Sequence, residues 1–298
     1  MATPLSAMAA GPGAMPVGNR LSALAPQPQM GDQPVNPIEQ EYFGRLQNDY
    51  PGLVQQYQQL KESDEGRILN TDVARELSPH YRADRTKSAD VHEPSSTFVK
   101  RLYAEKLAGP TPKGREPVVI FTAGGTGAGK STGMEVMKNV DKRLAKAEMV
   151  YDTNMNSFDS ADKKIRQALD AKREVDIVYT HRDPIEALTG GALRRAKNME
   201  EKHGSGRTVP LNEHARTHIG ARQVIEQLAA KYKNNPNVRI RVIDNSRGPG
   251  NARLSTIDKL PKLNENEIRK GLRDALERAK KSGAISDAIY RGTADYAR

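Results

Sequence analysis

Cysteine and tryptophan are absent from this 298-residue chain, and aromatic residues make up only 5% of it. Without cysteine the chain cannot form a disulfide, a cysteine-ligated zinc site or a thiol nucleophile. The absence is typical of proteins that work in a reducing compartment. We therefore expect a cytoplasmic location.

Long apolar runs are missing as well. No run in the sequence approaches the roughly 18–20 residues that span a bilayer, and the first residues lack the basic start and unbroken apolar stretch of a secretory signal. We expect neither a membrane partner nor a secretory leader. The length is enough for a full hydrophobic core in one large domain or two small ones.

Acidic residues are the minority among the charged side chains, which leaves a net charge of +10. Such an excess favours anionic partners such as nucleotides, nucleic acids or acidic lipid surfaces. The basic residues are spread along most of the chain with few aromatics near them. This pattern favours a dispersed basic surface over a dedicated nucleic-acid patch.

Three stretches of different composition divide the chain. Residues 1–36 are rich in Pro, Gly, Ala, Met and Gln without an apolar period, which predicts a disordered arm. Residues 37–65 predict a helical linker, with Tyr42 and Leu46 on one face. The folded domain is predicted over residues 66–298.

Within that domain, short apolar runs alternate with helix-compatible stretches. This alternation predicts an α/β fold, a parallel sheet with helices on both faces. The predicted strands are 67–70, 118–121, 148–151, 175–179 and 238–243.

One motif indicates the ligand. Residues 124–131 read Gly-Gly-Thr-Gly-Ala-Gly-Lys-Ser and match G-x-x-x-x-G-K-[S/T] at every fixed position. The predicted strand before the motif and the helix-compatible residues 132–140 after it supply the context that a phosphate-binding loop requires. We expect Lys130 to reach the β- and γ-phosphates and the Ser131 hydroxyl to bind Mg²⁺. The expected nucleotide-binding residues are Gly124, Gly125, Thr126, Gly127, Ala128, Gly129, Lys130, Ser131 and Thr132.

Two acids follow predicted strands, Asp72 and Asp152. In parallel sheets the chemistry lies at the carboxyl ends of the strands, so both acids are expected beside the loop. A phosphotransferase needs one carboxylate to accept a hydroxyl proton and another group to hold Mg²⁺ or substrate. Each acid has the alternative of a helix N-cap or turn residue. For Asp244, which follows a third strand, the capping role is favoured.

Phosphoryl transfer also needs positive charge around the γ-phosphate. Arg194 and Arg195 lie on the helix predicted to start at Pro184, and Arg207 lies in a glycine-containing segment that predicts a mobile lid. The alternative is an ordinary solvated basic face, which is favoured for Arg195 and not for Arg207.

These segments together resemble the zeta toxin family, P-loop kinases of bacterial toxin–antitoxin systems. Residues 150–154, Val-Tyr-Asp-Thr-Asn, look like the family's third-strand segment, which implies that Asp152 and Asn154 contact substrate. The helix over residues 183–196 resembles the lid helix with its phosphate-binding arginine, at Arg194 or Arg195. Residues 207–210, Arg-Thr-Val-Pro, resemble the segment of the second lid arginine.

The order of segments departs from the family. The strand with its D-x-D pair is missing after the phosphate loop, and residues 68–81 resemble it upstream. The resemblance implies that Asp72 is the catalytic base and places Asn70 where the family has its first acid. Arg101 also stands where the family tends to have an acid. We infer a circularly permuted kinase, with residues 107–118 as the new connection.

The function expected from the sequence is ATP-dependent transfer of the γ-phosphate to a hydroxyl of a small metabolite, such as a nucleotide sugar. The expected cofactors are ATP and Mg²⁺, and the resemblance implies an antitoxin protein as a partner. A polynucleotide 5′-hydroxyl kinase and a non-catalytic nucleotide-binding interaction module remain as alternatives. The sequence leaves ATP against GTP open.

Overall fold

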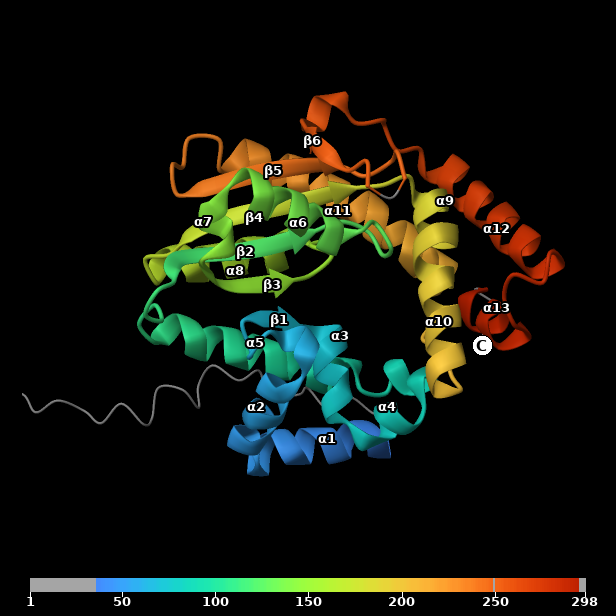
Figure 1. Cartoon of the computed structure of the whole chain (residues 1–298), viewed down its shortest axis with the longest axis horizontal. Coiled ribbons are helices and arrows are strands. Elements are labelled where there is room, and N and C mark those ends of the chain that lie inside the picture. The colour runs from blue at the N-terminus through green and yellow to red at the C-terminus, as the bar shows by residue number, and fades with distance from the viewer. Residues whose placement is uncertain (1–35, 249, 295–298) are drawn as a thin grey trace, which may run out of the picture. The chain divides into compact units, whose positions relative to one another are not determined.

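The computed structural model describes residues 36–248 and 250–294, which contain a six-stranded sheet in the order β1-β3-β2-β4-β5-β6 (Figure 1). The first five strands of that order pair in parallel, and β6 pairs antiparallel with β5. The strands are β1 (Ile68–Asn70), β2 (Glu116–Ala123), β3 (Ala147–Asp152), β4 (Glu174–His181), β5 (Val238–Asp244) and β6 (Arg253–Ser255). The five predicted strands are confirmed. Strand β6, three residues that are mostly exposed, carries no apolar pattern that could predict it.

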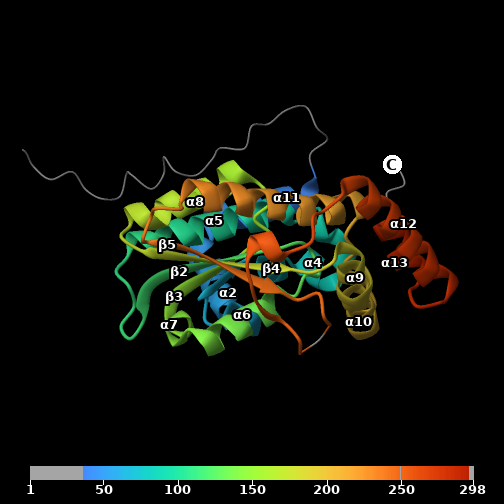
Figure 2. The ribbon, with the colours of Figure 1, turned by 90° about the horizontal axis from the view of Figure 1, so that it is seen from above.

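Helices cover both faces of the sheet (Figure 2). Successive side chains of β2 pack into different hydrophobic cores, because successive residues of a strand point to opposite faces of the sheet. Val119 and Phe121 pack in the larger core with the helices of one face, whereas Val118 and Ile120 pack in a smaller core with those of the other. The larger core includes α5 (His92–Ala108), α8 (Phe158–Asp170) and α11 (Leu211–Lys231); the smaller includes α6 (Lys130–Val140) and α7 (Lys142–Ala145). The predicted α/β class is confirmed.

The stretch expected as a linker packs into the larger core instead. It forms α1 (Pro37–Asn48) and α2 (Tyr50–Gln59), which are separated at Asp49, whose carboxylate accepts the N–H of Gly52. The Tyr42 hydroxyl donates to the carbonyl of Ala74, and Tyr57 donates to the carbonyl of Ile68. A 3₁₀ turn, η2 (Lys61–Ser63), follows α2. Residues from Asn36 onward belong to one compact unit. The arm expected over residues 1–36 lies outside the described residues except for Asn36.

Strand β1 lies at the end of the sheet order, next to β3. It pairs with β3 in parallel, so that Asn70 lies opposite Asp152 at the carboxyl ends of the two strands. Short helical segments and α5 follow β1 before the chain enters β2: they are α3 (Thr71–Ala74), η3 (Arg75–Leu77), α4 (Pro79–Ala83) and η4 (Arg85–Ser88). The circular permutation stays a prediction.

A third apolar cluster joins the segments after β4 to the C-terminal helices. The helix predicted from Pro184 is three segments, because a π-helical stretch interrupts it. The N-cap of the first segment, Asp183, accepts the N–H groups of Ile185 and Glu186. The segments that contribute to this cluster include α9 (Pro184–Ala187), η5 (Leu188–Leu193), α10 (Arg194–His203), α12 (Glu265–Lys281) and α13 (Asp287–Thr293). The 3₁₀ turn η6 (Ile257–Lys259) instead packs Ile257 against the larger core. No helix within the described ranges is both long enough and apolar enough to cross a membrane.

Candidate functional site

The phosphate-binding motif forms a tight loop between β2 and α6, which begins at Lys130. Gly127 and Gly129 have φ angles of 77° and 87°, a region that favours glycine. A Cβ atom at Gly127 would lie 2.3 Å from the carbonyl oxygen of Ala187, and one at Gly129 would lie 2.3 Å from Nδ2 of Asn245. The loop therefore needs these glycines for its conformation and for its packing. The helix behind it directs its N–H groups toward the loop.

Neighbouring elements hold the loop from outside. His218 Nε2 on α11 donates to the carbonyl of Thr126 (3.0 Å), and the Thr126 N–H donates to Thr217 Oγ1 (3.2 Å). Asn245, at the end of β5, donates to the carbonyl of Ala128 (2.8 Å). Burial, together with the nearby His214, lowers the pKa of His218 to about 3, so the His218 imidazole that holds the loop is neutral at physiological pH. The sequence did not predict these three supporting residues.

Lys130, Asp152 and Asn154 lie close together. Lys130 Nζ donates to Asn154 Oδ1 (2.9 Å) and lies 3.9 Å from Asp152 Oδ1. Asp152 is oriented through both carboxylate oxygens, because Thr122 donates to Oδ1 and Asn70 Nδ2 donates to Oδ2 (2.6 Å). The carboxylate therefore has a fixed direction beside the lysine.

Asp72 forms ion pairs with two arginines, Arg75 (3.0 Å) and Arg207. Desolvation raises the pKa of Asp72, but the charges of Arg207 and Arg75 outweigh it and hold the pKa well below its ordinary value. The carboxylate stays ionised. It lies on the side of the sheet where the strands have their carboxyl ends, as Lys130 does, and the charge of Lys130 lowers the pKa of Asp72 further.

Neither acid caps a helix among the described elements. The N-cap of α3 is Asn70, whose Oδ1 accepts the N–H of Asp72 (2.7 Å), and the N-cap of α8 is Ser157. Asn70 thus bridges the two acids through one amide. Asp244, in contrast, accepts the N–H of Ser246 in its turn, which confirms the capping role.

Arg75 is a site residue that the sequence analysis missed. It is buried, and it donates to Ser88 Oγ (2.8 Å) and His92 Nδ1 (2.8 Å) while it pairs with Asp72. Its spacing of three residues from Asp72 on a helical segment was the available signal.

The structure separates the two lid arginines of α10. The charges of Arg207, Asp72 and Asp152 act on Arg195, and desolvation lowers its pKa. Both side chains are exposed, and that of Arg194 forms no hydrogen bond or ion pair in the described part of the chain. The geometry therefore favours Arg195 over Arg194, although both remain predictions as catalytic residues.

The predicted Mg²⁺ ligands offer the oxygen donors that this ion prefers, the Ser131 hydroxyl and the Asp152 carboxylate. Within residues 36–248 and 250–294, no group of three or more His, Cys, Asp or Glu side chains could hold a metal ion. Mg²⁺ bound with a nucleotide commonly uses one or two protein ligands together with phosphate oxygens and water, so the donor set fits.

A parallel α/β sheet whose strand β2 runs through this loop into α6 defines a P-loop protein. Residues 140–249 match the family model described as "Zeta toxin", a span that includes β3, β4 and β5 and the lid arginines but not the phosphate loop or Asp72. This segment of the chain is thus similar to the zeta toxin family, which confirms the resemblance. The match supports a kinase-like, nucleotide-binding role in coarse terms.

One similar solved structure comes from a characterisation of the PezAT chromosomal toxin–antitoxin system of Streptococcus pneumoniae. It is 11% identical and aligns over 61% of this chain and 96% of that one, with a TM-score of 0.35. Likeness at this level carries no argument about activity. No curated protein matches the chain.

Proposed function

We propose that the protein is an ATP-dependent phosphotransferase that moves the γ-phosphate to a hydroxyl of a small metabolite. One observation supports this best: three groups lie together at the carboxyl ends of the strands. They are Lys130 in the phosphate loop, the ionised carboxylate of Asp72, and Arg207, which is paired with Asp72. A loop that only bound nucleotide would not require the last two.

The roles follow from these positions. ATP binds with its phosphates along residues 124–132, and Lys130 neutralises the β- and γ-phosphates. Ser131 and Asp152 would hold Mg²⁺, which supplies charge stabilisation to the phosphates. Arg207 and Arg195 stabilise the phosphoryl group in transit.

Asp72 accepts the acceptor's hydroxyl proton. Its lowered pKa makes it a weak base while Arg207 is paired with it. If Arg207 shares its charge with the γ-phosphate, the pKa of Asp72 rises toward the ordinary value and the carboxylate becomes a better proton acceptor. The same arginine thereby links phosphate binding to the strength of the base.

Asn154 and Asp152 would orient the acceptor, for which a nucleotide sugar is one candidate. By analogy with its family, the chain would have an antitoxin protein as its partner.

The test is transfer from γ-labelled ATP with Mg²⁺ and a bacterial small-molecule extract. The unmutated protein should label a metabolite, and Asp72→Asn should lower the rate more than about 10³-fold while ATP still binds, because the proton acceptor is lost. Lys130→Ala should weaken both ATP binding and transfer. Asp274→Asn, a change at an exposed acid of α12, is the matched control.

Each other result has a defined meaning. Undiminished turnover by Asp72→Asn would remove Asp72 as the base. Label found only on 5′-hydroxyl nucleic acids would establish the polynucleotide alternative. ATP binding without transfer to any acceptor would favour the non-catalytic module.

A further inference from the structure

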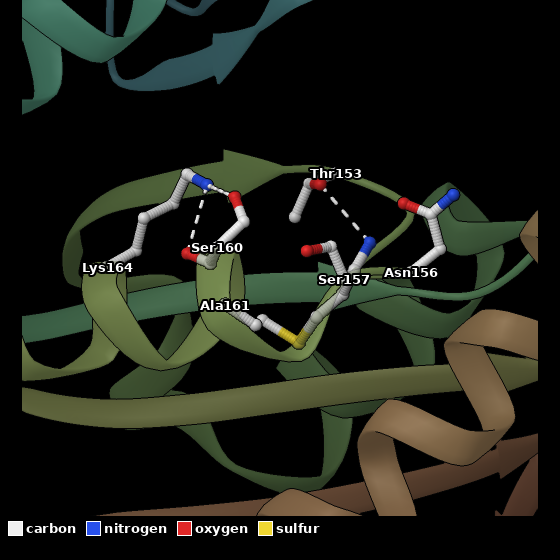
Figure 3. A pocket seen from close by; sticks show the side chains of 7 residues that line it. Thr153, Asn156, Ser157, Ser160, Ala161 and Lys164 are labelled. Atoms are coloured by element: carbon white, nitrogen blue, oxygen red, sulfur yellow. Dashed lines mark hydrogen bonds between the residues drawn. The ribbon is translucent and has the colours of Figure 1, made fainter.

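Two polar groups beside the site have no role in the phosphotransferase scheme above. One lines a cavity of about 40 Å³ where the chain leaves β3, and Figure 3 shows Lys164 donating to Ser160 there. The other is the buried Arg75 with its acceptor His92. Arg75 also pairs with Asp72, so this second group bears directly on the proposed proton acceptor.

Three segments hold the guanidinium of Arg75. Its Nη1 lies 3.0 Å from the Asp72 carboxylate on α3 and donates to Ser88 Oγ at the end of η4 (2.8 Å). Its Nη2 donates to His92 Nδ1 at the start of α5 (2.8 Å). The arginine side chain is only 9% exposed, so water does little to replace a contact that is lost. The position of Arg75, and through it that of the Asp72 carboxylate, therefore depends on these partners.

The hydrogen bond sets the protonation state of His92. An arginine side chain has only donors, so Nδ1 of His92 is the acceptor and the proton of the neutral ring lies on Nε2. A protonated imidazole would direct an N–H at the guanidinium, which would replace a hydrogen bond by a contact between two cations. The bond between Arg75 and His92 thus exists only while His92 is neutral.

The charged groups that act on His92 lie on three elements: Arg75 on η3, Asp72 on α3, and Glu93 and Lys100 on α5. The two cations favour the neutral ring and the two acids favour the charged one. On α1, which packs against α5, Glu39 faces Glu93 instead. Burial is the largest influence, and together with Arg75 it lowers the pKa of His92 below its ordinary value. About half of the His92 side chain is exposed (49%), so protons can reach it from solvent.

We propose that His92 is a positioning residue for the proton acceptor: its neutral imidazole holds Arg75, and Arg75 holds the Asp72 carboxylate. The proposal rests on the proposed function, in which Asp72 takes the hydroxyl proton. When Arg207 shares its charge with the γ-phosphate, Arg75 is the partner that stays with Asp72 and must be held from its other side. Protonation of His92 releases Arg75 and stops efficient transfer, while ATP still binds.

The pH profile of kcat/KM for the acceptor separates His92 from Asp72. The pKa of Asp72 is held well below its ordinary value, so its own titration comes at more acidic pH. Below the pKa of His92, the rate of the parent protein should fall about tenfold for each pH unit, in proportion to the neutral fraction. His92→Asn offers Oδ1 as an acceptor that does not titrate. It should stay within about threefold of the parent rate at pH 8 and lose this acid limb.

Two further variants complete the comparison. His92→Ala removes the acceptor and should lower transfer about tenfold at pH 8. His80→Asn, a change at an exposed histidine of α4, should leave the profile as it is in the parent. An unchanged acid limb in His92→Asn would overturn the proposal, and so would a rate in His92→Asn as low as that of His92→Ala.

The contact itself can be tested without turnover. In the unmutated full chain, nitrogen NMR follows the Arg75 guanidinium and the His92 imidazole as the pH is lowered. Both should shift with one midpoint, which Arg216, an exposed arginine paired with Glu213, should not follow. An Arg75 signal that stays constant through the titration of His92 would overturn the proposal. A shared midpoint in a protein that phosphorylates no acceptor would reject the proposed function, and with it the role of His92 in transfer, while the hold on Arg75 would stand.

Discussion

Two clusters of arginine and carboxylate groups lie toward opposite ends of the sheet, and they are built differently. The amino-end network consists of Arg143, Arg239 and Arg241 with Asp141, Glu174 and Asp176. Its centre, Asp176, is fully buried and accepts from Arg143 (2.6 Å) and Arg241 (2.9 Å). Each cation has a carboxylate partner within the network, so its charges balance.

The carboxyl-end site does not balance. Four cations, Lys130, Arg75, Arg195 and Arg207, act on only two carboxylates, Asp72 and Asp152. The same side-chain chemistry thus gives a closed structural network at one end and an excess of positive charge at the other. An excess of this kind is what a bound polyphosphate would neutralise. Changes at the two clusters should therefore affect different properties, function at one and stability at the other.

Among the arginines of the two clusters, the largest effect is expected at Arg207. Arg207→Ala should lower phosphoryl transfer about 10³-fold, because an arginine on the transferring group contributes on that scale. The melting temperature should change little, since its partner Asp72 keeps Arg75 and is partly exposed. Transfer assays and thermal unfolding of the same preparation check both halves. A large loss of stability with only a modest loss of transfer rate would show that the carboxyl-end site serves stability and not function.

Asp176→Asn should do the opposite. Removing the charge of a fully buried carboxylate breaks its ion pairs with Arg143 and Arg241, and the loss of a buried pair typically costs about 3–5 kcal/mol of unfolding free energy. Arg143 keeps Glu174 and Arg241 keeps Asp141, so we expect a loss near the lower end of that range. Urea unfolding measures that loss, and ATP binding at a temperature where the variant is folded should match the parent protein. Arg216→Ala, which removes an exposed pair with Glu213, should cost less than about 1 kcal/mol.

Asn70→Asp should make stability depend on pH. The new carboxylate would lie against Asp152 in place of a donor, so the two would share a proton and one pKa would rise above its unfolded value. A raised pKa means that the variant is closest to the parent at low pH and loses stability as pH rises through that pKa. We expect a deficit of about 2 kcal/mol at pH 8 that shrinks toward pH 5.

Asn70→Ser is the control for this variant, because serine can still cap α3 without adding a charge. Its difference from the parent should be the same at both pH values. A pH-independent deficit in Asn70→Asp would show that Asn70 acts only as a cap and does not orient Asp152.

The smallest effect separates neighbours on α10. Arg195→Ala should lower transfer about tenfold, since its charge lies near Asp72, Asp152 and Arg207. Arg194→Ala should change it less than about twofold, as expected for an exposed surface residue. Equal losses in the two variants would show that the excess charge at this end extends beyond the groups named.

The sequence predicted the parts of this molecule that local pattern controls. Apolar runs located five strands, and the glycine motif located the loop that the backbone angles then explain. Lys130 and Asn154 lie in the segments that follow β2 and β3, and these neighbouring parallel strands end on the same side of the sheet, which brings the two side chains together. Roles that depend on segments far apart could not be predicted, because a side chain's partner is then set by packing. Asn245 and Ala128 are 117 positions apart, and His218 and Thr126 are 92 apart.

The same reasoning explains the helices before β1. Their helical pattern was visible, but an amphipathic stretch does not reveal which core it covers. In the structure these helices cover the core around β1, and Tyr42 and Tyr57 donate hydrogen bonds to backbone carbonyls there.

The position of β1 early in the chain also determines the order in which the parts of the site are synthesised. The partner strand that closes the Asn70–Asp152 contact lies 82 positions later, and Arg207 emerges later still. The helices around β1 can pack first, since Tyr50 already reaches Glu105. Translation-stalled chains of increasing length, assayed for ATP retention and for transfer, would show when each ability appears. A polypeptide still on the ribosome therefore carries Asp72 long before Arg207, the group proposed to act with it.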